Sequence, residues 1–207
     1  MDGKVDAPRR RFAVSAADLT QAAVFAALIA ALGLPGTFTV GPTGVPITVQ
    51  TLGVMLAGSI LGPRKGALAV ALFAILAIAG LPILAGARTG LVSLSSPTAG
   101  FFVGWLPAAV VIGGLTAMMM PRYRVLWGIV INVVGGMAVI YAFGTVGLMI
   151  RTDLSWWAAL STNGVYVPGD VAKAVVTAFV AAQVHRARPG LIVPWRGARG
   201  RRRTSDG

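Results

Sequence analysis

Six apolar segments occupy most of this sequence, and its Lys and Arg residues fall almost entirely on one side of them. The segments cover approximately residues 17–34, 47–62, 66–84, 98–120, 125–150 and 167–184. A helix needs about 20 apolar residues to cross the hydrocarbon core of a bilayer. The second and sixth segments are short by this measure and the others are long enough. The pattern predicts an all-α, polytopic membrane protein whose six transmembrane helices form a compact bundle.

The distribution of positive charge predicts the topology. Four Lys and Arg residues precede the first segment, two lie between the second and third, two lie between the fourth and fifth, and seven follow the sixth. Only Arg88 and Arg151 fall on the other side, and Lys173 within a segment completes the total of 18. Because Lys and Arg are enriched in cytoplasmic loops, we expect both termini in the cytoplasm and a multi-pass protein of the cell membrane.

The composition excludes an ordinary soluble domain. Hydrophobic residues make up 56% of the chain and charged residues 12%, whereas soluble domains contain about 25% charged residues. We expect one membrane domain at 17–185, a basic cytoplasmic N-terminal tail at 1–16 and a disordered, Arg-rich cytoplasmic tail at 186–207. The expected roles of such basic tails are to set the topology of the chain and to attract anionic lipid. No folded basic module surrounds them, so a nucleic-acid partner is not expected.

Several chemical classes are missing from the sequence. There is no cysteine, which rules out a thiolate metal site, and the single His185 is typical of an interfacial residue rather than a metal ligand. The G-x-x-x-x-G-K-[ST] loop that binds ATP in P-loop proteins does not occur. No Ser/His/Asp set stands out either. We therefore expect no metal, no cofactor and no enzymatic activity.

The segment that begins near Val167 carries the strongest local signal. In VPGDVAKA (167–174), Pro168 and Gly169 open a helix and Asp170 lies in its first turn. Asp170 and Lys173 are three residues apart and share a helix face. A structural pair at the helix start is one interpretation. However, an ionisable pair at membrane depth is costly and by default marks a functional site, which is the interpretation that we favour.

The first segment carries two stripes of small residues spaced four apart. Ala22, Ala26 and Ala30 form one stripe, and Ala23, Ala27 and Ala31 form the next. Small residues at this spacing let another helix approach closely. The pattern alone fits packing inside the bundle or docking onto another membrane protein.

The ordered set of motifs resembles the BioY family, the biotin-binding S components of energy-coupling factor transporters. The resemblance covers roughly residues 15–185. Its motifs are VPITVQTLGVMLAG (45–58), LGPRKGALAV (61–70), GLPILAG (80–86), GARTG (86–90), SPTAGFFVGW (96–105) and PGDVAKA (168–174). It implies biotin as ligand, and a transmembrane coupling subunit with ABC-type ATPase subunits as partners. It also implies that the alanine stripe of the first segment docks onto the coupling subunit. One departure is Ala99, where many relatives have Gly.

The resemblance implies that a set of polar residues converges on biotin. A carboxylate such as Asp170 suits the N–H donors of the ureido ring, and a cation such as Lys173 or Arg88 suits its carbonyl or the carboxylate of the tail. The predicted substrate-binding residues are Asp170, Lys173, Arg88, Gln50, Thr48 and Tyr141. Asn132 is also polar and lies within a segment, but we expect it deeper in the membrane and rank it lower.

Two other classes remain as alternatives. A self-contained secondary transporter or channel for a small anionic vitamin would be supported by broken helices in matched inverted halves, and the sequence contains no convincing repeat. A membrane-embedded enzyme is disfavoured by the missing catalytic set.

Overall fold

The computed structural model describes residues 15–36, 38, 39 and 46–195 of the 207 residues. The predicted basic tails, and most of the loop between the first two segments, lie largely outside the described residues. The helices are α1 (Ala16–Ala31), α2 (Gln50–Ile78), α3 (Gly90–Leu94), α4 (Ala99–Met119), α5 (Val125–Asn132), the π-helix η1 (Val133–Ala138), α6 (Val139–Thr152), α7 (Trp156–Thr162), the 3-10 turn η2 (Asn163–Val165) and α8 (Val167–Ala187). Two short antiparallel strands, β1 (Phe38–Thr39) and β2 (Pro46–Ile47), precede α2.

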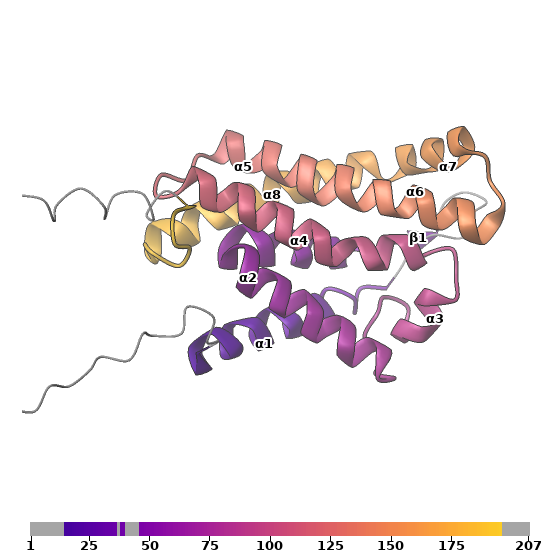
Figure 1. Ribbon diagram of the computed structural model, residues 1–207, viewed down its shortest axis with the longest axis horizontal. Coiled ribbons are helices and arrows are strands. Elements are labelled where there is room, and N and C mark those ends of the chain that lie inside the picture. The colour runs from indigo at the N-terminus through magenta and orange to yellow at the C-terminus, as the bar shows by residue number, and fades with distance from the viewer. Residues whose placement is uncertain (1–14, 37, 40–45, 196–207) are drawn as a thin grey trace, which may run out of the picture.

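The helices lie roughly along one axis and form a bundle (Figure 1). Four helical stretches are long and apolar enough to cross a membrane, namely α2, α4, α8 and the continuous run of α5, η1 and α6. The apolar α1 is shorter. These helices confirm the prediction of a helical membrane protein.

Helix α2 is a hairpin of two helical halves. Gly62 has φ 79° and ψ −175°, a conformation outside the helical region, and Pro63 follows it. A straight helix of 29 residues would be about 43 Å long. Yet the Gln50 side chain at its start is hydrogen-bonded to Ile83 and Ala85, just beyond its end. The chain therefore reverses at Gly62 (Figure 1).

The two halves of α2 correspond to the second and third predicted segments, with one correction. The third segment was predicted to continue to residue 84, but the helix ends at Ile78. Gly80 takes a positive φ of 109° and Pro82 follows, so the helix cannot continue. Leu84 is apolar because it packs in the hydrophobic core, with 4% of its surface exposed, and not because it belongs to a helix.

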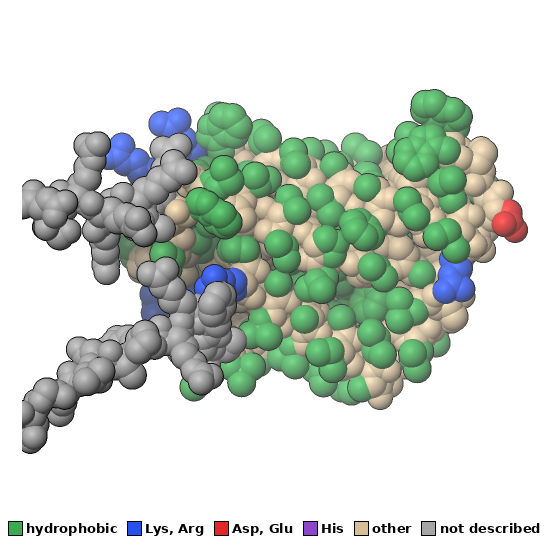
Figure 2. Space-filling model, viewed as in Figure 1, with side chains coloured by type: hydrophobic (Ala, Val, Ile, Leu, Met, Phe, Trp, Pro, Cys, Tyr) green, Lys and Arg blue, Asp and Glu red, His purple; other side chains and the backbone are tan. Residues whose placement is uncertain are grey.

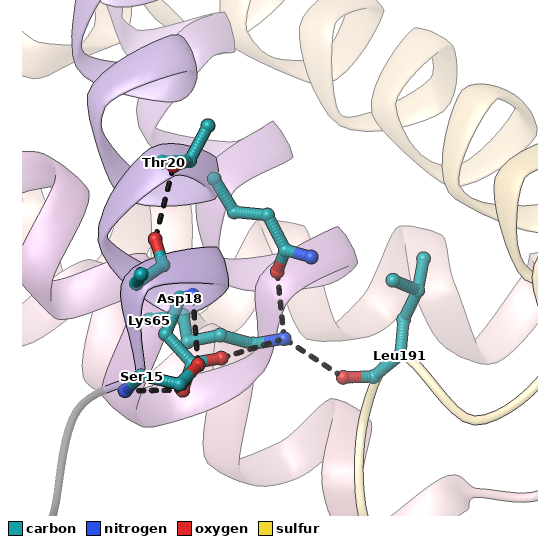
Figure 3. Close-up of polar contacts among 7 residues, drawn as sticks. Ser15, Asp18, Thr20, Lys65 and Leu191 are labelled. Atoms are coloured by element: carbon teal, nitrogen blue, oxygen red, sulfur yellow. Dashed lines mark hydrogen bonds and ion pairs between the residues drawn. The ribbon is translucent and has the colours of Figure 1, made fainter.

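A polar network holds the end of the bundle at which α1 begins (Figure 3). Ser15 and Asp18 form a capping box at the start of α1. The Lys65 ammonium, in the turn of α2, donates to Gln21 Oε1 at 2.8 Å and to the Leu191 carbonyl at 3.2 Å, and it lies 3.8 Å from Asp18. The network joins three segments that are far apart in the sequence.

His185 satisfies a carbonyl that the turn of α2 leaves without a helical partner. Pro63 has no N–H, so it cannot bond to the Ser59 carbonyl four residues earlier. The His185 Nε2–H donates to this carbonyl at 2.9 Å, and its ring stacks on Tyr123 at 5.3 Å between centroids. Asn132 is also a structural residue at this depth, since its amide donates to Ser59 Oγ at 3.1 Å and to the Gly128 carbonyl.

Exposed hydrophobic side chains cover much of the surface of the bundle. Large hydrophobic side chains such as Leu126 and Ile150 are exposed. Figure 2 shows such side chains along the whole bundle, whereas Lys and Arg gather chiefly at the end where α1 begins. An apolar surface of this kind suits the hydrocarbon core of a bilayer.

The structure separates the two alanine stripes of α1. Ala22 and Ala26 are buried, with 0% and 4% of their surface exposed, and pack inside the bundle. This corrects the predicted docking set, because residues covered by the protein itself cannot contact a partner. Ala23 and Ala27 are exposed, as is Ala31, and Ala30 is half-buried.

Candidate functional site

A cavity lies at the end of the bundle opposite the Lys65 network. Its empty volume is about 620 Å³, including the part open to solvent, within the range of small-molecule sites. The lining residues are Ile47, Thr48, Gln50, Thr51, Leu84, Arg88, Ser93, Thr98, Phe101, Phe102, Trp105, Ile140, Tyr141, Tyr166, Asp170 and Lys173. All six predicted substrate-binding residues are among them.

The first turn of α8 supplies an ion pair to this cavity. The Lys173 ammonium lies 2.7 Å from Asp170 Oδ1, and the two side chains are 14% and 9% exposed. Lys173 also donates to the Thr48 carbonyl at 2.6 Å and to Thr51 Oγ1 at 3.1 Å. The three donors of the ammonium are thus used, and they tie α8 to the start of α2. Thr48 takes part through its backbone carbonyl, a contact that its side-chain chemistry did not predict.

Tyr141 of α6 completes the surroundings of the carboxylate. Its hydroxyl donates to Asp170 Oδ2 at 2.7 Å, so each carboxylate oxygen accepts one hydrogen bond from the side chains of the described residues. An ionised carboxylate has about four lone-pair sites. Asp170 therefore keeps acceptor capacity for a further donor in the cavity.

Arg88 stands on a tight turn between α2 and α3. Leu84 and Arg88 form a β-bridge, and Gly86 and Ala87 between them both have positive φ values. Arg88 donates to the Ala85 carbonyl at 3.3 Å and to Thr98 Oγ1 at 3.4 Å. Burial lowers the pKa of its guanidinium, which still leaves it cationic at neutral pH. Within the described residues Arg88 has no acidic partner, so its remaining N–H groups can bind an anion.

Gln50 is occupied by the backbone. Its amide nitrogen donates to the carbonyls of Ile29 and Ile83, and its amide oxygen accepts from the Ala85 N–H at 2.8 Å. The residue is 1% exposed. Gln50 thereby holds the end of α1 and the turn that carries Arg88, and it shapes the cavity by positioning these elements.

Aromatic side chains form the wall that sequence reasoning missed. Phe101 packs edge-on against Tyr166 with ring centroids 6.0 Å apart, and Phe102 packs against Trp105 at 5.6 Å. The three aromatic residues of α4 occur together in FFVGW, near the start of the fourth segment. That cluster was a usable signal. Ser93 and Thr98, which share a hydrogen bond of 2.8 Å, add polar groups beside Arg88.

The site has the features of a small-molecule binding site. It combines apolar and aromatic walls with a few convergent polar groups, the usual anatomy of a small-molecule pocket. Among the described residues, no three His, Cys, Asp or Glu side chains come together to hold a metal ion. The fixed charges that line the cavity are one carboxylate, Asp170, and two cations, Lys173 and Arg88.

Comparison with protein families matches residues 6–190 to the BioY family. The chain belongs to the BioY family. Two curated members illustrate the similarity. A protein of Rhodobacter capsulatus named biotin transporter BioY is 41% identical over 185 residues, which are 85% of this chain and 97% of that protein. A protein of the same name from Rhizobium etli is 43% identical over 178 residues, 83% of this chain and 94% of that protein.

A solved structure is similar to this chain in three dimensions. It is the crystal structure of the S component for biotin from an ECF-type ABC transporter. The two chains superpose with a TM-score of 0.80 at 28% identity, and the alignment covers 84% of this chain and 93% of the other. The relatives are thus named as transporters and transporter components, not as enzymes.

Proposed function

We propose that this chain is the biotin-binding S component of an energy-coupling factor transporter, which captures biotin at the outer face of the cell membrane. The observation that carries the proposal is the hydrogen-bonded set of Tyr141, Asp170 and Lys173 beside an aromatic-walled cavity. Membership of the BioY family and the names of its relatives support biotin as the ligand.

The site chemistry matches the functional groups of biotin. The ureido ring offers N–H donors and one carbonyl acceptor, and the tail ends in a carboxylate. Asp170 accepts from the ureido N–H groups with its free lone pairs, since hydrogen bonds to an ionised acceptor are the strong ones. Arg88, without an acidic partner among the described residues, binds the tail carboxylate or the ureido carbonyl. Trp105 and Tyr166 enclose the apolar part of the ring system.

The proposed topology has six spans and both termini in the cytoplasm. The two halves of α2 provide two spans, and α1, α4, α5–α6 and α8 provide the others. The turn of α2, the turn between α4 and α5 and the end of α8 all lie at the end where α1 begins (Figure 1). They carry Lys65, Arg122, Arg124 and Arg186, which favours that end as the cytoplasmic one. The cavity then faces outward.

Energy for uptake comes from partners in this proposal. The sequence has no P-loop for ATP, so hydrolysis belongs to ABC-type ATPase subunits, joined through a transmembrane coupling subunit. The exposed face of α1 with Ala23, Ala27 and Ala31 is the proposed docking surface. It presents small residues to the lipid phase, where close helix approach stabilises association.

Two measurements on the purified chain test the proposal. Calorimetric titration is expected to show biotin binding by the chain alone, and no comparable binding of thiamine or riboflavin. Proteoliposomes are expected to accumulate biotin only when the coupling subunit, the ATPases and ATP are also present. Accumulation driven by an ion gradient with the chain alone would instead establish a secondary transporter.

A further inference from the structure

A second hollow lies on the lipid-facing side of the bundle, far from the biotin cavity. It runs between the end of α4 and the start of α5, and its empty volume is about 1480 Å³ including the part open to the surroundings. We call it the α4–α5 groove. Its lining residues are Leu115, Met118, Met119, Pro121, Arg122, Arg124, Trp127, Val130, Ile131 and Val134.

The groove is apolar along its length and cationic at one end. Met118, Trp127 and Val130 are 61%, 57% and 48% exposed, so no other part of the described chain covers them. Arg122 and Arg124 stand at the end toward the α4–α5 turn. The described part of the chain provides neither of them with a carboxylate, because its ion pairs are Lys65 with Asp18 and Lys173 with Asp170.

The length of the groove matches one leaflet of a bilayer. From Arg124 to Val134 the chain advances ten residues, or about 15 Å of helix. This is half of the roughly 30 Å hydrocarbon core. Val134, near the start of the π-helix η1, is the lining residue farthest along the chain from the two arginines. An acyl chain lying in the groove would place its headgroup at the two arginines.

We propose that the α4–α5 groove binds an anionic phospholipid of the leaflet at which α1 begins. Its acyl chain lies against Met118, Trp127 and Val130, and its phosphate pairs with Arg122 and Arg124. Basic side chains near an anionic leaflet attract its headgroups, and Met side chains adapt to an irregular flexible partner.

A phospholipid suits this face better than a partner protein does. Helices α5 and α1 lie on opposite sides of the bundle (Figure 1), so a subunit docked on the exposed alanine face of α1 would leave the groove in lipid. Hydrophobic side chains and cations also lie next to each other at this end of the bundle in Figure 2. This surface complements a phospholipid, whose apolar tail adjoins an anionic headgroup.

Trp127 provides a local probe for the test. The chain is placed in phosphatidylcholine nanodiscs that contain a minor fraction of brominated phosphatidylglycerol or, in a parallel sample, brominated phosphatidylcholine. Quenching of Trp127 is the difference between wild type and Trp127→Phe, which removes the contribution of the other four tryptophans. We expect brominated phosphatidylglycerol to reach half of its maximal quenching at a mole fraction at least about fivefold lower than brominated phosphatidylcholine does. A fivefold preference is the effect expected when roughly one basic residue attracts an anionic headgroup.

Substitutions distinguish lipid binding in the groove from a general attraction of anionic lipid to the basic end of the bundle. Arg122→Gln/Arg124→Gln should equalise the two lipids, whereas Arg186→Gln/Arg188→Gln, with the same change of charge at the same end, should keep the preference. Unchanged melting temperatures show that the variants fold. Equal quenching in wild type, or a preference lost in both double variants, would overturn the proposal. The proposal would also be overturned if neither lipid quenched Trp127 after the coupling subunit was added, because a protein would then cover the groove. Biotin binding plays no part in this readout.

Discussion

The two Lys–Asp pairs of the described chain use the same chemistry for different ends. At the end where α1 begins, Lys65 lies 3.8 Å from Asp18, with side chains 20% and 35% exposed. At the other end Lys173 lies 2.7 Å from Asp170, with side chains 14% and 9% exposed. The first pair belongs to a network of caps and turns. The second borders the cavity of the proposed biotin site.

The cost of desolvation makes the Lys173–Asp170 pair the unusual one of the two. A surface pair contributes about 0–1 kcal/mol and incurs little desolvation. A buried pair loses hydration that its mutual attraction repays only when the geometry is good and other hydrogen bonds complete it. Asp170 and Lys173 have those hydrogen bonds, from Tyr141 and to Thr48 and Thr51. Stability alone is a weak reason to keep such a pair, and ligand binding is a stronger one.

The largest effect is expected at Ala27 on the exposed face of α1, a residue that belongs to neither pair. Ala27→Trp should abolish ATP-dependent uptake by the assembled transporter and leave biotin binding intact, because a large side chain on the exposed face holds the coupling subunit away. Co-purification with the coupling subunit and a biotin titration measure both properties. Ala26→Trp, on the buried face, should instead reduce the yield of folded protein. Full uptake by Ala27→Trp would remove this face as the docking surface.

A packing substitution tests the end of the bundle that carries the Lys65 network. An added Cβ at Gly113 would clash with the Gly62 carbonyl carbon and the Pro63 nitrogen, so Gly113→Ala should destabilise the fold by about 1–3 kcal/mol through overpacking. The neighbouring Gly114 has free space at this position, and Gly114→Ala should be neutral or slightly stabilising. Thermal unfolding of the two variants compares them, and equal melting temperatures would contradict the close contact at the α2 turn.

Removing the Tyr141 hydroxyl tests the proposed biotin site with a smaller change. Tyr141→Phe deletes the hydrogen bond to Asp170 Oδ2 while the ring remains. Biotin binding should weaken by about 1 kcal/mol, or roughly fivefold, because the carboxylate loses a donor that orients it. Isothermal titration measures the change. A Tyr141→Phe variant with wild-type affinity would mean that this contact does not position the carboxylate for the ligand.

The smallest effect is expected at the other pair. Asp18→Asn should change stability little, since an exposed ion pair contributes little and Lys65 keeps its bonds to Gln21 and Leu191. It should not change biotin affinity. A loss of biotin binding in this variant would mean that the two ends of the bundle are coupled, contrary to the division described above.

The sequence predicted the helices better than their ends and partners. The cations Arg64 and Lys65, with Gly62 and Pro63, marked the reversal within α2 as a loop between two apolar segments. The continuation to Leu84 was wrong because hydropathy reports burial, and a buried loop residue has the same hydropathy as a helical one. The short helices α3 and α7 fall inside predicted loops, since their Ser-rich and Trp-rich sequences have no clear periodicity.

Some residues of the site could also be predicted from the sequence, and others could not. Asp170 and Lys173 were predictable because three-residue spacing places two side chains on one helix face. The bonds of Gln50 were not, since its partners are backbone groups of Ile29, Ile83 and Ala85, and no side-chain pattern encodes a backbone partner. The buried and exposed faces of α1 were likewise indistinguishable, because alanine occupies both.

The central claim is that Asp170 binds ligand and does not merely pair with Lys173. A double-mutant cycle of Asp170→Asn and Lys173→Ala, followed by biotin titration, tests it most directly. Asp170→Asn alone is expected to weaken binding by more than about 1.4 kcal/mol, or tenfold, because an amide presents donors to the ureido N–H groups. Adding Lys173→Ala to the Asp170→Asn variant is expected to cause a further loss. Wild-type affinity in Asp170→Asn would contradict the account, and so would a double variant no weaker than either single one.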